Sequence, residues 1–163
     1  MKLTELIKNV GDCKVTPSAD VDVSHIAYNT LNVLNGSCFV AIRGNNSDGH
    51  LFVDDAITKG AVAVVTEEKM KVPKGIANVV VHDSRLAMAS ISSVFFGEPS
   101  KKMSVIGVTG TNGKTTITYI LEEIFKTASK NPGVIGTVSY RYDGKIIPAP
   151  HTTPMSFDLQ KLF

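Results

Sequence analysis

The stretch 103–125, which reads MSVIGVTGTNGKTTITYILEEIF, constrains this chain more than any other part of its sequence. Its first residues, among them Val105, Ile106 and Val108, predict a buried strand, and its last residues predict a helix. Between them lies the glycine-rich segment 110–116, GTNGKTT. A buried strand, a glycine-rich turn and a helix in this order are typical of a loop that binds phosphate groups. The predicted helix carries apolar residues on one face, at Ile117, Ile120, Leu121, Ile124 and Phe125.

The chemistry of this loop favours a nucleoside triphosphate. Gly110 and Gly113 carry no Cβ, so the backbone amides around them can turn toward an anion. The loop leads into a helix N-terminus, whose unpaired N–H groups and partial positive charge also favour phosphate. Lys114 is the candidate catalytic residue, because its ammonium can reach the β and γ phosphates, and the Thr115 hydroxyl is the candidate Mg²⁺ ligand. The predicted ATP-binding residues are Gly110, Thr111, Asn112, Gly113, Lys114, Thr115 and Thr116.

The loop departs in one position from the usual G-x-x-x-x-G-K-[ST] pattern. Where that pattern places its first glycine this sequence has Val108, and it offers Gly107 and Gly110 instead. The alternative interpretation is a glycine-rich strand-to-helix turn in which the Lys-Thr pair is incidental. We favour the phosphate-binding loop because the strand, turn, Lys-Thr pair and helix all occur in the required order.

The composition indicates a soluble folded chain. Of 163 residues, 43% are hydrophobic and 20% are charged, which suffices for a core. The net charge of +2 comes without a basic run, so nothing indicates nucleic acid as a partner. Cys13 and Cys38 lack metal-ligand spacing and indicate reduced thiols. No run approaches the roughly 20 apolar residues of a membrane span. The N-terminus predicts an amphipathic helix rather than a signal peptide, with apolar residues at Leu3, Leu6, Ile7 and Val10. We therefore expect a cytoplasmic protein that does not contact a membrane.

Strands alternating with helices place residues 1–99 in the α/β class, with mostly parallel pairing. Apolar runs predict strands at 21–28, 38–42, 61–65 and 79–81, and 11–20 is predicted as loop. One helix is expected with Phe52, Ala56 and Ile57 on its buried face, ended by Gly60. A second helix is expected after Asp83 or Ser84 as N-cap, with buried positions at Leu86, Ala87, Ser90, Ile91, Val94 and Phe95.

The segment 97–102, GEPSKK, predicts a domain boundary, which gives two domains, 1–99 and 100–163. In the second domain we expect the phosphate-binding loop, a strand at 134–139, a hairpin turn at Asp143-Gly144 and a helix from Met155. A complete sheet around such a loop needs more strands than these. We therefore expect a fragment of a larger protein; the alternative is a complete small protein.

Three stretches carry a resemblance to a known family. Residues 38–63 read CFVAIRGNNSDGHLFVDDAITKGAVA, residues 106–116 read IGVTGTNGKTT, and Thr152-Thr153-Pro154 follow later. Together they resemble the N-terminal portion of the Mur ligases, the ATP-dependent ligases that build the peptidoglycan stem peptide. The resemblance implies a small N-terminal α/β uridine-binding domain, followed by the start of a P-loop α/β ATPase domain.

Within this family the chain is most similar to the type that adds the third, diamino residue to UDP-N-acetylmuramoyl-L-Ala-D-Glu. The resemblance implies ATP and Mg²⁺ as cofactors, an acyl-phosphate intermediate, a monomer, and a role in building the cell wall. The incoming diamino acid stays open, and the chain alone is expected to be inactive. The related ligase that adds the terminal dipeptide is an alternative, although it is not expected to have T-T-P. Folate polyglutamating ligases share the loop but lack the uridine domain.

The resemblance also implies substrate-binding residues. By position, Asn45, Asn46 and Ser47 would line the uridine pocket, and His151, Thr152 and Thr153 would contact the substrate between the domains. One site departs from the family, because Tyr28-Asn29-Thr30 stands where Asp-Ser-Arg is usual. Asn29 can still hydrogen-bond to the uridine end, but the acid and the arginine are absent.

Other candidates are weaker. No pair among His25, His50, His82 and His151 has metal-ligand spacing. His50 is interpreted as a helix-start residue rather than a base. Neighbouring residues on a helix point about 100° apart, so Asp54-Asp55 and Glu122-Glu123 are interpreted as solvated faces. Two alternative functions stay open: a non-catalytic module that binds a nucleotide or UDP-sugar, and a kinase-like enzyme with an unrelated acceptor.

Overall fold

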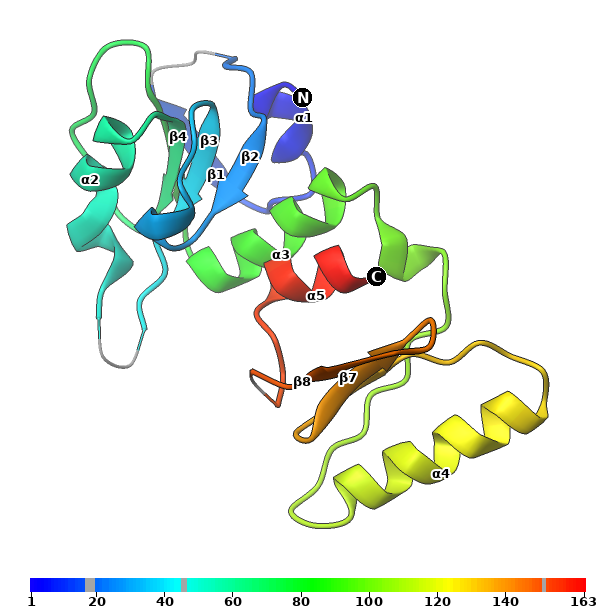
Figure 1. Cartoon of the computed structure of the whole chain (residues 1–163). Coiled ribbons are helices and arrows are strands. Elements are labelled where there is room, and N and C mark those ends of the chain that lie inside the picture. Colours follow the sequence, from blue (N-terminus) through cyan, green and yellow to red (C-terminus); the bar gives the residue numbers. More distant parts are fainter. Residues whose placement is uncertain (17–19, 45–46, 151) are drawn as a thin grey trace. The chain divides into compact units, whose positions relative to one another are not determined.

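The computed structural model describes residues 1–16, 20–44, 47–150 and 152–163. They form two compact units, Met1–Pro99 and Ser100–Phe163 (Figure 1). Both units combine helices with a sheet, which confirms the α/β class. None of the helices in these ranges has the length and hydrophobicity needed to cross a bilayer.

The first unit is built on a five-stranded sheet of order β1-β5-β4-β3-β2. Its strands are β1 Cys13–Thr16, β2 His25–Ala27, β3 Ser37–Val40, β4 Ala61–Thr66 and β5 Ala77–Val81. The strands β2 to β5 pair in parallel, as predicted, whereas β1 lies antiparallel to β5 at the edge. The prediction of a loop over 11–20 is wrong for β1, whose side chains alternate between half-buried and exposed. An alternation of burial over only four residues is too short to distinguish an edge strand from a loop in the sequence.

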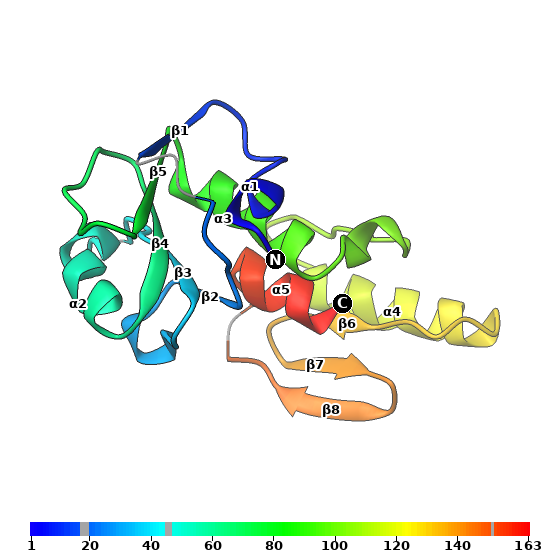
Figure 2. The ribbon, with the colours of Figure 1, turned by 90° about the horizontal axis from the view of Figure 1, so that it is seen from above.

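Helices cover both faces of this sheet, with α2 on one face and α1 and α3 on the other (Figure 2). Their bounds are α1 Leu3–Leu6, η1 Thr30–Asn32, η2 Gly49–Phe52, α2 Val53–Thr58, α3 Ser84–Phe95 and η3 Pro99–Lys101. The core under α2 contains Phe39, Val53, Ala56 and Val64. Buried Ile91 and Val94 confirm the predicted inner face of α3, but Leu86 is 67% exposed. Met88 occupies the buried position instead, because the helix turns its 87–88–91 side to the sheet.

The N-cap of α3 is Asp83, whose side chain accepts hydrogen bonds from the Arg85 and Leu86 amides. This confirms one of the two predicted caps. At the start of the chain, Leu3 and Leu6 are buried as predicted, although α1 ends at Leu6.

The second unit contains a three-stranded antiparallel sheet of order β6-β7-β8. Its elements are α4 Lys114–Thr127, β6 Val134–Ile135, β7 Ser139–Tyr142, β8 Lys145–Pro148 and α5 Ser156–Leu162. The predicted hairpin turn is confirmed: Asp143 and Gly144 have φ of 49° and 71°, as a tight two-residue hairpin turn requires. The predicted strand 134–139 is divided instead between β6 and the first residue of β7.

The predicted buried strand ahead of the phosphate-binding loop is not formed. Residues 104–109 have no regular structure, and Val105 and Ile106 are 57% and 56% exposed. A parallel strand obtains its backbone hydrogen bonds from neighbouring strands, and within the described residues none pairs with this segment. The predicted apolar face of α4 is also exposed, with Ile117, Ile120 and Ile124 about half exposed.

Candidate functional site

The predicted phosphate-binding loop ends where α4 begins, at Lys114. Gly113 is the N-cap with φ 78°, and Gly110 has φ 148°, both in the region that favours glycine. Because Gly113 has no side chain, it caps none of the first-turn amides of α4. Those amides are available to an anion at a helix N-terminus, which also carries partial positive charge.

Lys114 folds back over this loop. Its Nζ donates hydrogen bonds to the carbonyl oxygens of Gly110 and Thr111. The Lys114 ammonium is therefore bonded to the backbone of its own loop. The other predicted loop residues are exposed: Thr111, Asn112, Thr115 and Thr116.

The first turn of α4 suits magnesium only in part. The Thr115 side chain is exposed beside the first-turn amides, and a hydroxyl oxygen is a hard ligand of the kind Mg²⁺ accepts. Elsewhere in the described ranges, no three His, Cys, Asp or Glu side chains come together in a way that could hold a metal ion. Thr115 could thus supply one ligand, with phosphate oxygens and water supplying the others.

An ion pair joins α4 to the hairpin, and the sequence did not reveal it. Glu122 is 6% exposed, and its Oε2 accepts hydrogen bonds from Arg141 Nε at 2.9 Å and from a terminal Arg141 nitrogen at 2.6 Å. Arg141 also lies over the Tyr119 ring, 4.1 Å from its centroid. The hydrogen bonds from Arg141 hold the pKa of Glu122 below its ordinary value. The prediction of a solvated face is therefore wrong for Glu122, although the Glu123 side chain is 71% exposed.

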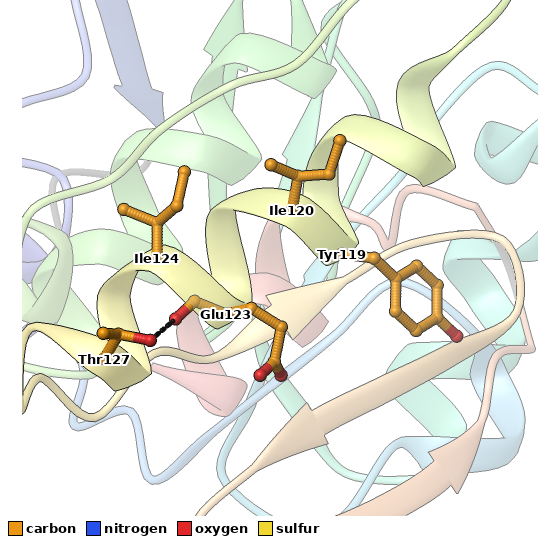
Figure 3. Close-up of a pocket in the computed structure, with 5 residues that line it drawn as sticks. All are labelled: Tyr119, Ile120, Glu123, Ile124 and Thr127. Carbon is orange, nitrogen blue, oxygen red and sulfur yellow. Dashed lines mark hydrogen bonds between the residues drawn. The ribbon is translucent and has the colours of Figure 1, made fainter.

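A shallow hollow runs along the same helix (Figure 3). It is lined by Tyr119, Ile120, Glu123, Ile124 and Thr127. The Thr127 hydroxyl donates to the Glu123 carbonyl at 2.8 Å, so this polar group is already engaged. The hollow is mostly apolar and offers few groups for a phosphate. The loop at the start of α4, rather than this hollow, is the candidate nucleotide site.

In the first unit, charged side chains gather where the parallel strands end. Ligands of open parallel sheets bind at this carboxyl edge. Arg43, after β3, lies 3.3 Å from an Asp48 oxygen and 3.6 Å from a Glu67 oxygen. Glu67, directly after β4, accepts hydrogen bonds from the Ser84 amide and hydroxyl at the start of α3. The hydrogen bond from the Ser84 amide is the main cause that lowers the pKa of Glu67. The network thus joins the ends of three neighbouring parallel strands.

Two predicted substrate residues belong to this edge. Asn29 follows β2, and its side chain accepts a hydrogen bond from the Leu31 amide at 2.9 Å, which caps η1. Ser47 follows β3, is exposed, and accepts a hydrogen bond from the Gly44 amide. Because β2 and β3 are parallel neighbours, Asn29 and Ser47 lie at the same edge of the sheet.

The other predicted substrate residues fall elsewhere. Asn45, Asn46 and His151 lie outside the described residues. Thr152 and Thr153 are exposed and precede α5 in the second unit.

Sequence reasoning interpreted His50 as a helix-start residue, and it does lie in η2. It is also 5% exposed and hydrogen-bonded at both ring nitrogens, which sequence reasoning missed. The only sequence signal was its place in the Asp48-Gly49-His50 triplet.

These features define an α/β chain with a glycine-rich loop that leads into a helix, a candidate phosphate-binding loop, and a polar carboxyl edge on a mostly parallel sheet. Two family models match it: "Mur ligase family, catalytic domain" over residues 22–96, and "Mur ligase middle domain" over residues 108–163. The chain belongs to the Mur ligase family.

Similar proteins agree with this assignment. A UDP-N-acetylmuramoyl-L-alanyl-D-glutamate--2,6-diaminopimelate ligase of Caldanaerobacter subterraneus subsp. tengcongensis is 41% identical over 100% of this chain and 34% of its own length. The ligase of the same name from Clostridioides difficile is 42% identical over 100% of this chain and 34% of its own. The chain thus spans about a third of the length of these relatives.

The fold is also similar to a solved structure. A crystal structure of MurF from Acinetobacter baumannii matches with a TM-score of 0.61 at 22% identity, covering 86% of this chain and 29% of that one. At this identity the likeness shows the fold alone.

Proposed function

We propose that this chain is the N-terminal portion of an ATP-dependent ligase that adds 2,6-diaminopimelate to UDP-N-acetylmuramoyl-L-alanyl-D-glutamate. The observation that carries the proposal is the loop 110–113, which leads into the uncapped N-terminus of α4 with Lys114 as its first residue. Relatives about 40% identical over the whole chain are named as ligases for this reaction, which supports the choice of substrate.

The two units would bind different parts of the reactants. Residues 1–99 would bind the uridine end of the substrate at the carboxyl edge of the sheet, with Asn29 and Ser47 among the contacts. Residues 100–163 would begin the ATP-binding domain, with Thr152 and Thr153 directed at the substrate. The remaining catalytic parts would belong to a longer polypeptide, which would act as a cytoplasmic monomer in peptidoglycan synthesis.

The reaction would proceed through an acyl phosphate. The substrate's terminal carboxylate attacks the γ phosphorus of ATP, and ADP leaves. The amine of the incoming amino acid then attacks the acyl carbon, and phosphate leaves as the amide forms. The protein would mainly position the reactants and neutralise charge, because phosphoryl transfer requires little covalent chemistry from protein groups.

The chain's own groups fit this task. The first-turn amides of α4 and the Lys114 ammonium would neutralise charge on the β and γ phosphates. Magnesium, when bound beside Thr115, would supply further charge neutralisation. The hydrogen bonds of Lys114 to the Gly110 and Thr111 carbonyls would be replaced by bonds to phosphate oxygens, which would place its positive charge beside the phosphates.

The test is titration of the 163-residue chain with Mg-ATP by calorimetry. We expect binding by the wild-type chain and at least roughly a tenfold weaker affinity for Lys114→Ala, because a charge-assisted hydrogen bond is lost. Lys130→Ala is the matched control, since Lys130 is an exposed lysine beyond the end of α4. Equal affinity for the Lys114→Ala and wild-type chains would refute the role of the loop.

A further inference from the structure

Helix α4 supplies the N-terminus of the candidate nucleotide site, yet most of its surface is exposed. Of its 14 residues, all of which the structure describes, only Glu122 is buried. Ile117, Ile120 and Ile124 are about half exposed, and the segment 104–109 has no regular structure against which the helix could pack. A helix of this length is marginally stable in isolation, because its first turn is costly to form. The packing that keeps α4 folded therefore comes mainly from the side that carries Glu122.

That side of α4 is bonded to the hairpin of β7 and β8. Glu122 Oε2 accepts two hydrogen bonds from Arg141 of β7. Arg141 also donates to Ser139 Oγ at 2.9 Å and lies over the Tyr119 ring of α4. Lys126 bonds to Glu122 as well, but it belongs to α4 itself and its side chain is 51% exposed. Arg141 thus links the hairpin to two side chains of the helix.

Arg141 does not belong to the nucleotide site itself. All three of its guanidinium nitrogens are already hydrogen-bonded within this unit. Its partner Glu122 follows Lys114 by eight residues, which is about 12 Å along the helix axis at 1.5 Å per residue. Any effect of Arg141 on the binding of a phosphate group would therefore pass through the helix.

Phosphate binding at the start of α4 and packing at its middle are thermodynamically linked. The first-turn amides can bind a phosphate group together only while that turn is helical. A ligand that binds the folded helix and not the unfolded one stabilises the folded form, and this coupling is reciprocal. If a weaker link to the hairpin leaves the helix folded in one molecule in ten, the apparent affinity falls about tenfold.

We propose that Arg141 and Glu122 are positioning residues: their ion pair holds α4 against the hairpin and thereby keeps the first turn of the helix in the conformation that binds phosphate groups. This inference rests on the proposed function, which assigns ATP binding to that turn. It adds a role for two residues that do not touch the nucleotide. Because the coupling is reciprocal, it also predicts that the hairpin becomes more stable when the nucleotide binds.

The test combines nucleotide affinity with amide hydrogen exchange in the 163-residue chain. Mg-ATP is titrated by calorimetry into the wild type, Arg141→Ala and Arg141→Lys. Exchange in β7 and β8 is measured with and without saturating Mg-ATP, alongside exchange in β4 and β5 of the first unit. Lys145→Ala is the matched control, because it removes a positive charge from an exposed position of the same hairpin.

We expect Arg141→Ala to bind Mg-ATP roughly tenfold more weakly, because the buried Glu122 carboxylate loses its partner on the hairpin. Arg141→Lys should lose only about threefold, since an ammonium can still pair with the carboxylate although it offers a single nitrogen. In the wild type, Mg-ATP should slow exchange in β7 and β8 and leave β4 and β5 unchanged. In Arg141→Ala, Mg-ATP should leave exchange in the hairpin unchanged. Lys145→Ala should behave like the wild type in both measurements.

Two results would overturn the inference. One is an affinity of Arg141→Ala for Mg-ATP equal to that of the wild type. The other is hairpin exchange in the wild type that saturating Mg-ATP does not slow, and this result is decisive whether or not Arg141→Ala folds. If the wild-type chain itself does not bind Mg-ATP, the proposed function fails and takes the inference with it. Binding by the wild type together with either of the two results removes the inference alone.

Discussion

Removing the buried carboxylate of Glu122 should destabilise the second unit strongly. Glu122 is 6% exposed and the Arg141 side chain is 12% exposed, so each buried charge is compensated mainly by the other rather than by water. Removing one partner of a buried ion pair costs about 3–5 kcal/mol, because the other charge stays buried without compensation. The additional bond to Lys126, whose side chain is 51% exposed, contributes little. We therefore expect Glu122→Ala to lower the free energy of unfolding of this unit by about 3 kcal/mol.

Urea denaturation followed by tyrosine fluorescence can measure this effect. The chain has no tryptophan and four tyrosines, of which Tyr119, Tyr140 and Tyr142 belong to the second unit. Glu123→Ala is the matched control on the adjacent, exposed position, and it should change the free energy of unfolding by less than about 0.5 kcal/mol. Equal effects of Glu122→Ala and Glu123→Ala would refute the claim that the Arg141 pair holds the hairpin on α4.

The same pair predicts a pH dependence. Hydrogen bonds from Arg141 lower the folded-state pKa of Glu122 from its ordinary value of 4.5. The unfolded chain therefore takes up the proton first as the pH falls. The contribution of the pair should be complete above pH 4.5 and disappear as the pH falls through the lower folded-state pKa. Glu122→Gln should lose this dependence, and an unchanged pH profile in that variant would contradict the assignment.

Two further predictions test other parts of the chain. Burial raises the pKa of the Cys38 thiol to about 12, so iodoacetamide at pH 8 should alkylate half-buried Cys13 well before Cys38 in the folded chain. Equal rates would show that Cys38 is accessible. Gly113→Ala places a side chain at φ 78°, which should destabilise the loop by about 1 kcal/mol and weaken Mg-ATP binding, whereas Gly133→Ala, where φ is not positive, should not weaken it. Calorimetry decides this, and unimpaired binding by Gly113→Ala would contradict the geometry of the loop.

The parts of the fold that the sequence predicted are those with local causes. The continuous apolar run 61–65 predicts a buried strand without reference to other parts of the chain, and β4 forms there. Asp83 caps α3 because its side chain bonds to amides two and three residues ahead. Asp143-Gly144 sets its hairpin turn through backbone conformations that these residue types adopt readily. Such features need no knowledge of distant contacts.

The parts that the sequence did not predict depend on distant partners. The predicted strand with Val105, Ile106 and Val108 requires neighbouring strands, and the described residues provide none beside it. Glu122 was interpreted as part of a solvated face because it neighbours Glu123 on a helix, whereas Arg141 reaches it from a hairpin nineteen residues later. His50 bonds to Glu67 across seventeen residues, which no helix or strand period reveals.

The candidate site divides in the same way. The glycines and lysine of the predicted phosphate-binding loop are found from their spacing in the sequence, and the helix that this spacing predicts does begin at Lys114. The polar network at the carboxyl edge of the first unit joins three strand ends and is visible only once the sheet is assembled.

The measurement that tests the central claim most directly is calorimetric titration of the 163-residue chain with UDP-N-acetylmuramoyl-L-alanyl-D-glutamate. ADP-glucose serves as a matched nucleotide sugar with a different base. With the loop 110–116 saturated by Mg-ATP, we predict one-to-one binding of the UDP compound and no binding of ADP-glucose. Tight binding of Mg-ATP together with no response to the UDP compound would contradict the account and would favour a kinase-like enzyme with another acceptor.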